Sequence, residues 1–182
     1  MDMGTGLVRR GLLRDARGIA AVLVDTWRTT YRGIVPQPYL DSLSYDSREQ
    51  RWRGVLANAA TAPEEERQFV HVAESDGRVV GFVVGGATRN RDRMPSFSSE
   101  LYAVYLLVAY QGHGLGRQLV RALAADLREA GHTSMLVWVL AENPSRHFYE
   151  ALGGQLVERR ATEIGGASLD ELGYGWADIM SL

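Results

Sequence analysis

Lysine and cysteine are both absent from this chain of 182 residues, and each absence excludes several kinds of site. Without lysine there is neither a Schiff base on a side-chain amine nor a P-loop, because both need that amine. Without cysteine there are no disulfides, no thiolate metal ligands and no cysteine nucleophile. The 20 basic side chains other than histidine are therefore all arginines.

Long apolar runs and an excess of positive charge are absent too. The longest apolar run, residues 103–110, has eight residues, whereas a membrane-spanning helix needs about 20. Residues 1–11 contain two arginines and no apolar stretch, so we expect no secretory signal and a cytoplasmic location. The formal net charge of −2 leads us to expect no nucleic acid as a partner, and the short apolar runs lead us to expect no membrane.

What is present is the composition of an ordinary globular protein. Hydrophobic residues make up 46% of the chain and charged residues 23%, which excludes wholesale disorder. A length of 182 residues is within the roughly 100–200 residues of one domain. We therefore predict a single domain that spans residues 1–182.

Hydrophobic periodicity predicts an alternation of strands and helices. Period-two or continuous apolar runs predict strands at residues 7–13, 69–73, 78–87, 100–108, 134–140, 154–163 and 172–179. Amphipathic repeats predict helices at residues 15–32, from residue 47 to a gradual end at 57–62, at 116–130 and at 145–152. The pair Asp76-Gly77 between two strands predicts a tight hairpin. This order predicts an α/β fold with a mixed sheet flanked by helices.

A glycine-rich turn, Gln111-Gly112-His113-Gly114-Leu115-Gly116, joins the strongest predicted strand to the best predicted helix. Glycines let a ligand approach the backbone, and a helix N-terminus offers unpaired N–H groups and a positive dipole end. Phosphate or pyrophosphate binds to such a turn without lysine. The dinucleotide fingerprint does not fit, because its third glycine position falls on Arg117 or Leu119. A turn that serves only the fold is the alternative.

The spacing Gln111-x-x-Gly114-x-Gly116 resembles the signature of the GNAT superfamily of acetyl-CoA-dependent N-acetyltransferases. Residues 100–108 resemble the fourth strand of that family, and residues 143–154 resemble the segment after its fifth strand. The segments Trp27-Arg28-x-x-Tyr31-x-Gly33 and Tyr174-Gly175-Trp176 resemble the family's first helix and closing strand. The resemblance implies a mixed, mostly antiparallel twisted sheet that is splayed between the fourth and fifth strands.

The resemblance also implies a site for acetyl-CoA as co-substrate. Backbone N–H groups of the glycine turn would hold its pyrophosphate, and the end of the fourth strand would bind the pantetheine arm through its backbone. Asn143 would lie near the same molecule, although it can equally cap the helix that follows. The implied cofactor-binding residues are Leu106, Leu107, Val108, Gln111, Gly112, His113, Gly114, Leu115, Gly116, Arg117, Asn143 and Arg146.

Two residues are candidates for proton transfer. The position of Tyr149 implies a general acid that protonates the leaving thiolate, because a phenol with a pKa of about 10 is protonated at pH 7. The alternative for Tyr149 is an aromatic residue of the core. Glu100 would take the proton of the amine, directly or through water, and otherwise it is a charge at the end of a strand. His71 is a less favoured base, since a single histidine among apolar neighbours is usually structural.

The acceptor side is less defined by the sequence. Trp27 and Tyr31 are four residues apart on one helix face, so they either rim the acceptor cleft or pack in the core. Residues 89–97 form a polar loop that we also expect at the rim of this cleft. No spacing of His, Asp and Glu indicates a metal site.

The resulting functional prediction is an N-acetyltransferase. It would transfer an acetyl group from acetyl-CoA to a primary amine of a small molecule or peptide. Direct attack in a ternary complex is favoured, because there is no Cys and no convincing Ser–His pair for a covalent intermediate. One alternative is a non-catalytic acyl-CoA-binding sensor or interaction module on the same fold, and another is a nucleotide-binding regulator that uses the glycine turn. A homodimer is compatible with the family resemblance.

Overall fold

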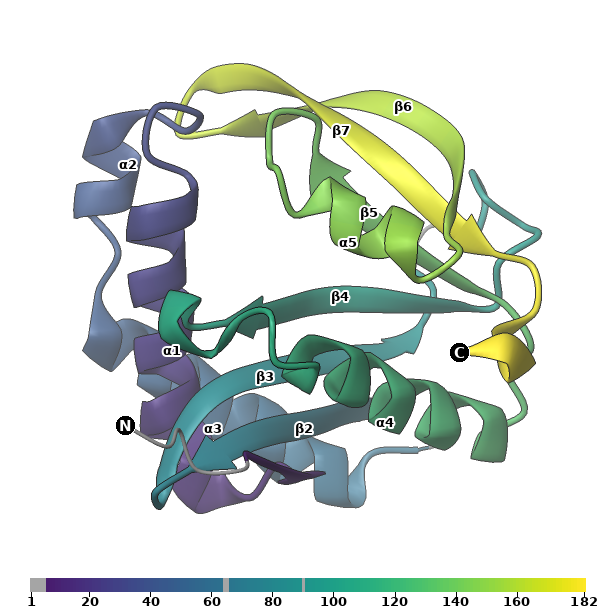
Figure 1. Ribbon diagram of the computed structural model, residues 1–182, viewed down its shortest axis with the longest axis horizontal. Helices are drawn as coiled ribbons and strands as arrows, with labels where there is room; N and C mark the ends of the chain where they lie inside the picture. Colours follow the sequence, from purple (N-terminus) through teal and green to yellow (C-terminus); the bar gives the residue numbers. More distant parts are fainter. Residues whose placement is uncertain (1–5, 64–65, 90) are drawn as a thin grey trace.

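Helices cover both faces of one twisted sheet in the computed structural model, which describes residues 6–63, 66–89 and 91–182 (Figure 1). Residues 1–5 of the segment expected to carry no secretory signal thus lie outside the described residues. The strands are β1 (Leu7–Arg10), β2 (Gln68–Ser75), β3 (Arg78–Ala87), β4 (Ser99–Leu106), β5 (Met135–Leu140), β6 (Gln155–Ile164) and β7 (Ala167–Trp176). The α-helices are α1 (Ala16–Thr30), α2 (Gln37–Asp41), α3 (Tyr45–Thr61), α4 (Leu115–Glu129) and α5 (Arg146–Ala151).

The seven strands follow the order β1-β2-β3-β4-β5-β7-β6. Neighbouring strands are antiparallel throughout, except that β4 and β5 are parallel. The predicted α/β fold with a mixed, mostly antiparallel sheet is therefore confirmed.

The sheet opens between β4 and β5. Only Ser99–Leu101 of β4 pairs with β5, at Met135–Val137. Beyond these three pairs the two strands diverge toward α1 (Figure 1). The predicted splay is confirmed. It leaves the second half of β4 with a hydrogen-bonding edge that no strand among the described residues covers.

Each face of the first half of the sheet has its own apolar core. Helix α4 packs on β2, β3 and β4 through Leu119, Leu123 and Leu127, all fully buried. Helices α1 and α3 pack on the opposite face, where Val72 and Phe82 are completely buried. Since both faces are covered, β2 and β3 have nearly continuous apolar sequences rather than a strict alternation.

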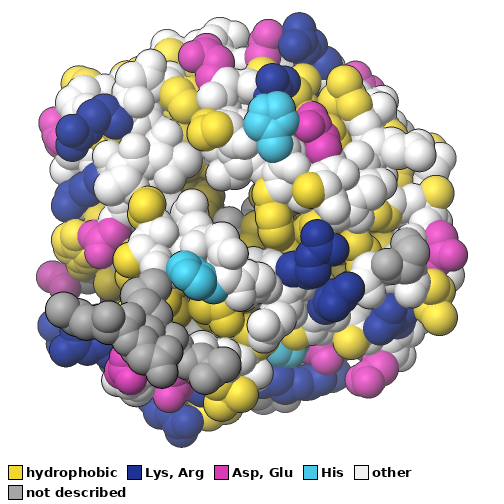
Figure 2. All heavy atoms as spheres, in the orientation of Figure 1, with side chains coloured by type: hydrophobic (Ala, Val, Ile, Leu, Met, Phe, Trp, Pro, Cys, Tyr) yellow, Lys and Arg dark blue, Asp and Glu magenta, His cyan; other side chains and the backbone are white. Residues whose placement is uncertain are grey.

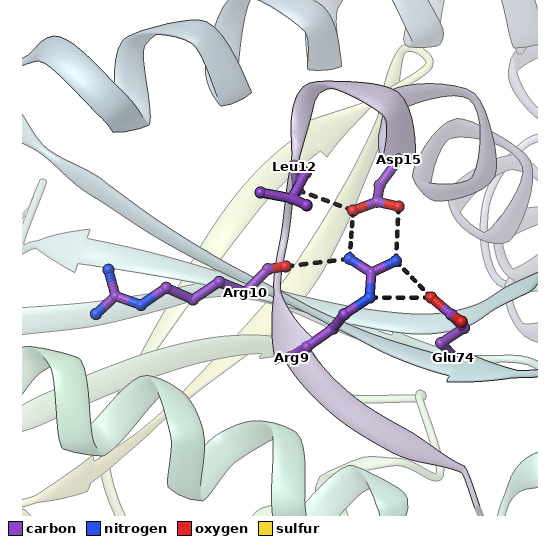
Figure 3. A network of polar contacts seen from close by, with 5 residues as sticks. All are labelled: Arg9, Arg10, Leu12, Asp15 and Glu74. Atoms are coloured by element: carbon purple, nitrogen blue, oxygen red, sulfur yellow. Dashed lines mark hydrogen bonds and ion pairs between the residues drawn. The ribbon is translucent and has the colours of Figure 1, made fainter. Parts of the chain in front are cut away.

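The first strand is held by a group of ion pairs at the entrance to α1 (Figure 3). The guanidinium of Arg9 on β1 donates to both carboxylate oxygens of Asp15, at 2.7 and 2.9 Å, and to Glu74 on β2. The backbone N–H of Leu12 donates to Asp15 as well, at 2.8 Å. The side chain of Arg9 thereby joins β1 both to the nearby start of α1 and to β2, 65 residues further along the chain.

Two predicted strands are too long. The strand predicted at 7–13 ends at Arg10, because the chain then turns into a short 3₁₀ helix, Leu13–Asp15. The strand predicted at 100–108 ends at Leu106, and Val108 begins another 3₁₀ turn, Val108–Tyr110, with its side chain 65% exposed. The Leu107 N–H still donates to the Val80 carbonyl (2.9 Å), after which the chain leaves the sheet.

Other differences involve proline and glycine. Helix α2 was not predicted. Pro36 and Pro38 are typical of the loop after a helix end, but proline is also tolerated in a first helical turn, where Pro38 lies. The closing strand begins at Ala167, five residues before the predicted start. Ile179, which is buried, belongs to a 3₁₀ turn after it. Gly165 and Gly166 both have positive φ angles and make the tight turn between β6 and β7.

Candidate active site

A groove of about 500 Å³ lies where the open part of β4 meets the glycine turn and α5. The space-filling view shows this face of the molecule hollowed near its centre (Figure 2). The residues that line the groove are Val104, Leu106, Gln111, Gly112, Gly114, Gly116, Arg117, Pro144, Ser145, Phe148 and Tyr149.

The glycine turn has the conformation that its composition predicts. Gly112 and Gly114 have φ angles of +80° and +82°, in the left-handed region that favours glycine, and Gly114 is the N-cap of α4. The first backbone N–H of α4 to reach an earlier carbonyl is that of Gln118, which donates to Gly114 at 3.1 Å. The N–H groups of residues 115–117 therefore precede the hydrogen bonding of the helix and are available to an anion.

The side chain of Gln111 closes the end of β4. Its Nε2 donates to the carbonyl of Leu106 at 2.9 Å, and the next N–H, of Leu107, donates to Val80. The backbone edge that remains without a partner strand is therefore Tyr102–Leu106, upstream of the predicted segment 106–108. A linear ligand can pair with such an edge as an added strand does.

A smaller cavity of about 70 Å³ lies between the diverging strands and α1. Its walls are formed by Thr26, Thr30, Tyr31, Tyr102, Ala103, Val104, Tyr105, Leu106, Gln111, Val137, Trp138, Val139, Asn143, Ser145 and Tyr149. The cavity and the groove share five of these residues, and Tyr149 is one of them.

Tyr149 lies on α5 with 6% of its surface exposed, in ring contact with Phe148 and Tyr174. Burial raises the pKa of its phenol above the ordinary value, and the nearby Tyr105 adds to the effect. The phenol is therefore protonated over the whole neutral range. Within the described residues its hydroxyl has no hydrogen-bond partner, so it is available to a ligand at the junction of groove and cavity.

The predicted acceptor residues take different places. Tyr31 lines the cavity, and its hydroxyl accepts a hydrogen bond from Asn143 Nδ2 at 3.2 Å. Trp27 does not line the cavity; it lies behind it, where its ring packs on Tyr31 and its Nε1 donates to the Tyr105 hydroxyl at 3.0 Å. Burial raises the pKa of Tyr31 to about 12 and that of Tyr105 well above its usual value.

Glu100 lies outside both the groove and the cavity. Its residue is 1% exposed, and its two carboxylate oxygens accept from the Arg89 guanidinium (2.5 Å) and the Arg89 backbone N–H (3.0 Å). The loop that carries Arg89 closes the paired end of the sheet, where Phe97 lies against Gly175. The described residues of this loop therefore do not rim the cavity, in contrast to the expectation from the sequence.

The predicted cofactor-binding residues divide into three groups. Leu106, Gln111, Gly112, Gly114, Gly116 and Arg117 line the groove together. Asn143 lines the cavity instead, and its Oδ1 accepts the Ser145 N–H at 2.9 Å, so it also caps the turn into α5. Leu107, Val108, His113, Leu115 and Arg146 line neither space, and Leu115 is a core residue of α4.

Four groove residues were missed by sequence reasoning: Val104, Pro144, Ser145 and Phe148. Val104 had a local signal, since it lies two residues before Leu106 and therefore on the same face of β4. The signal for Phe148 was non-local, because it depends on how α5 packs against α4. Its ring lies 3.3 Å from where a Cβ on Gly116 would be, so the glycine allows α4 and α5 to approach closely.

The other candidate base, His71, lies away from the groove and the cavity. His71 on β2 is buried with its Nε2 3.5 Å from Asp126 on α4, away from groove and cavity. Within the described parts of the chain, no three His, Asp or Glu side chains gather in a way that could hold a metal ion. None of the described helices is long and apolar enough to cross a membrane.

Known proteins resemble this chain in sequence and in fold. The family model described as FR47-like protein matches residues 79–162. The curated "Uncharacterized N-acetyltransferase YuaI" of Bacillus subtilis (strain 168) is 38% identical over 175 residues, which cover 96% of this chain and 95% of the relative.

Two solved structures share the fold. The PaiA N-acetyltransferase from Thermoplasma acidophilum in complex with coenzyme A has a TM-score of 0.72 at 18% identity and covers 92% of this chain and 98% of its own. The yncA structure from Salmonella typhimurium with its cofactor acetyl-CoA has a TM-score of 0.69 at 21% identity, with coverage of 95% and 94%.

Proposed function

Since this chain belongs to the GNAT superfamily of N-acetyltransferases, we propose that it transfers an acetyl group from acetyl-CoA to a primary amine of a small molecule or peptide. One observation carries this proposal. The groove, which has the size and the anion-binding groups for a nucleotide thioester, meets a small cavity at the protonated phenol of Tyr149. Acetyl-CoA in the groove and an amine in the cavity can therefore both reach the phenol of Tyr149, from two sides.

The groove offers the groups that acetyl-CoA requires. The N–H groups of residues 115–117 and the positive end of the α4 dipole suit its pyrophosphate, and Arg117 adds the nearby positive charge. We assign the pantetheine arm to the open edge of β4 at Val104–Leu106, where its amides can pair with the strand. Coenzyme A and acetyl-CoA bound to the two structural neighbours support this assignment.

The chemistry follows from the position of Tyr149. The amine nitrogen attacks the thioester carbonyl directly, so that an N–C bond forms and the C–S bond breaks. The phenol then gives its proton to the departing thiolate, which would otherwise be a poor leaving group in a buried site. The phenolate takes up the one proton that the amine nitrogen loses as the amide forms, so the proton balance is closed. Direct attack needs no covalent intermediate, in keeping with a chain that contains no cysteine.

The test is an amine panel with acetyl-CoA, in which release of free thiol is followed for the wild type and Tyr149→Phe. We expect kcat to fall tenfold or more in the variant, because general acid catalysis contributes roughly 10²–10⁴ in rate, while the Kd for acetyl-CoA stays nearly the same. Tyr45→Phe is the matched control, since Tyr45 also loses a hydroxyl but lines neither groove nor cavity.

Unchanged turnover in Tyr149→Phe would remove the phenol from the mechanism. Acetyl-CoA binding without transfer to any amine would instead indicate a non-catalytic sensor and contradict the proposed function.

A further inference from the structure

Helix α5 carries Tyr149 but is too short to keep a fixed position by itself. It has six residues, which make less than two turns, whereas isolated helices shorter than about 12–15 residues are marginal in water. The position of the phenol therefore depends on the contacts that α5 makes with the rest of the fold. Because no hydrogen bond from the described residues reaches the Tyr149 hydroxyl, the packing of the ring has to orient it.

Two side chains of β7 fasten α5 by hydrogen bonds. The Tyr174 hydroxyl donates to Glu150 Oε1 at 2.6 Å, and Trp176 Nε1 donates at 2.9 Å to the carbonyl of Leu152, the C-cap of α5. The two donors are two residues apart and therefore project from the same face of β7, which lies beside α5 (Figure 1). Both acceptors follow Tyr149 within three residues, so the bonds hold the part of the helix that carries the phenol.

The same two side chains of β7 also pack on the ring of Tyr149. The Tyr174 ring is stacked on it with a centroid distance of 6.3 Å, and the Trp176 ring meets it edge-on at 6.5 Å. Both distances are within the range of about 4.5–7 Å in which aromatic rings attract one another. Tyr174 and Trp176 are 3% and 4% exposed, so both are fixed in the core. One strand thus holds both the helix and the ring that the helix carries.

Glu150 gives Tyr174 a charged partner at the surface. Its other oxygen, Oε2, lies 2.9 Å from His147 Nδ1. The hydrogen bonds from Tyr174 and His147 hold the pKa of the Glu150 carboxyl below its ordinary value, so it is a carboxylate at neutral pH. Hydrogen bonds to a charged acceptor are stronger than neutral ones. Glu150, Tyr174 and Trp176 line neither the groove nor the cavity, so they act on Tyr149 and not on a ligand.

We propose, on the basis of the acetyl transfer proposed above, that Tyr174 and Glu150 are positioning residues of the reaction, which hold the phenol of Tyr149 where the groove meets the cavity. Proton transfer requires donor and acceptor atoms within about 2.6–3.2 Å of each other. A displacement of about 1 Å can lower the rate about 10²-fold. Trp176 supports the same arrangement at the C-terminal end of α5.

The first test is Tyr174→Phe, which keeps the stacked ring and removes only the hydroxyl. With the best amine of the panel, we expect kcat to fall about three- to tenfold, a part of what a 1 Å displacement can cost. The Kd for acetyl-CoA and the KM for the amine should stay nearly the same. Tyr45→Phe is the matched control, because Tyr45 donates to the Asp25 carboxylate at the same distance, 2.6 Å, and lines neither space.

A double-mutant cycle separates positioning from general stability. A residue that acts through Tyr149 has nothing further to lose once the phenol is gone. In the Tyr149→Phe background, Tyr174→Phe should therefore change kcat less than about twofold, since the two residues are coupled. An equal loss of kcat in both backgrounds would show a role independent of Tyr149 and would overturn the inference.

Variants of Glu150 test the same contact from the side of the helix. Its side chain is 43% exposed, so we expect substitutions there to leave the fold intact. Glu150→Ala removes the acceptor and should lower kcat as Tyr174→Phe does. Glu150→Gln keeps a carbonyl oxygen for the Tyr174 hydroxyl and should restore most of the lost rate. Wild-type kcat in Glu150→Ala, or the same loss in both Glu150 variants, would contradict the positioning role.

The inference and the proposed function fail in different ways. A low kcat in Tyr149→Phe together with wild-type kcat in Tyr174→Phe and Glu150→Ala would overturn the inference alone. Unchanged kcat in Tyr149→Phe would remove both the acid and the residues that position it. Transfer to no amine, with acetyl-CoA still bound, would contradict the proposed function and the inference together.

Discussion

At the scale of single residues, the glycine turn carries the strongest local information. The place of Gly112 and Gly114 between a strand and a helix predicts that they bind a ligand, and both have positive φ angles, which favour glycine. Tyr149 shows the opposite case. Its two readings, core aromatic and general acid, are compatible, because one side chain packs among Phe148 and Tyr174 and still reaches the groove.

A paired substitution separates the strain at Gly114 from its role in the site. Gly114→Ala and Gly166→Ala each place a Cβ in open space at a φ near +82°, so each should lower the free energy of unfolding by about 1 kcal/mol. Only Gly114→Ala should weaken acetyl-CoA binding, severalfold or more, because it shifts the N–H groups of residues 115–117. Urea unfolding and titration calorimetry measure the two effects. Equal affinity in both variants would contradict the assignment of the turn to the pyrophosphate.

At the scale of elements, the ends of helices and strands depend on contacts that local hydrophobic periodicity does not predict. β4 ends at Leu106 because Gln111 takes its carbonyl, and β1 ends at Arg10 because Asp15 captures the N–H of Leu12. Proline misled the prediction of α2, since it can begin a helix as well as follow one. The pair Gly165-Gly166 was a signal for the β6–β7 hairpin that sequence reasoning did not use.

The ion pairs that Arg9 of β1 makes with Asp15 and Glu74 should make the free energy of unfolding depend on pH (Figure 3). Burial acts to raise the pKa of the Asp15 carboxyl, but the hydrogen bonds from Arg9 and Leu12 outweigh it and hold that pKa below its ordinary value. Because the pKa is lower in the folded state than in the unfolded one, the stabilisation is complete above the unfolded pKa. It is lost as the pH falls from there through the folded pKa.

The matching experiment is urea unfolding of the wild type and Asp15→Asn at several pH values between 7 and 3. At pH 7 we expect the variant to be less stable by about 1–3 kcal/mol, since it loses charge-assisted hydrogen bonds to Arg9. The difference should shrink as the pH falls below the unfolded pKa of Asp15, since the stabilisation by its carboxylate is lost on the way to the lower folded pKa. A difference that does not change with pH would show that the carboxylate charge contributes nothing.

At the scale of the whole molecule, the functional feature is the opening between two parts of one sheet. The sub-sheet β1–β4 and the sub-sheet β5–β7 share only three paired positions along β4 and β5, and the groove and cavity occupy the space where they part (Figure 1). A ligand that pairs with β4 and also contacts α5 would tie the two parts together.

Acetyl-CoA should therefore stabilise the folded protein. At a free concentration of 100 times its Kd, the expected gain in the free energy of unfolding is about 2.7 kcal/mol. For a chain of this size that corresponds to a rise in Tm of roughly 5–10 °C. Thermal unfolding with acetyl-CoA, ATP and NAD at equal concentrations measures it. A larger rise with ATP or NAD would indicate a nucleotide-binding regulator and contradict the assignment of the groove.

The sequence by itself determined the features that depend on short-range interactions, namely most helices and strands and the glycine turn. Apolar periodicity predicted most strands and helices, and the spacing Gln111-x-x-Gly114-x-Gly116 predicted the turn, because hydrophobic pattern and backbone freedom are local properties. Only the tertiary structure decided which side chains share a space. It brought Asn143 to Tyr31 across 112 positions and turned Glu100 to Arg89. It also buried Trp138 Nε1 and Thr26 Oγ1 without partners. Such contacts depend on how the splayed strands pack against α1, and no local pattern encodes that packing.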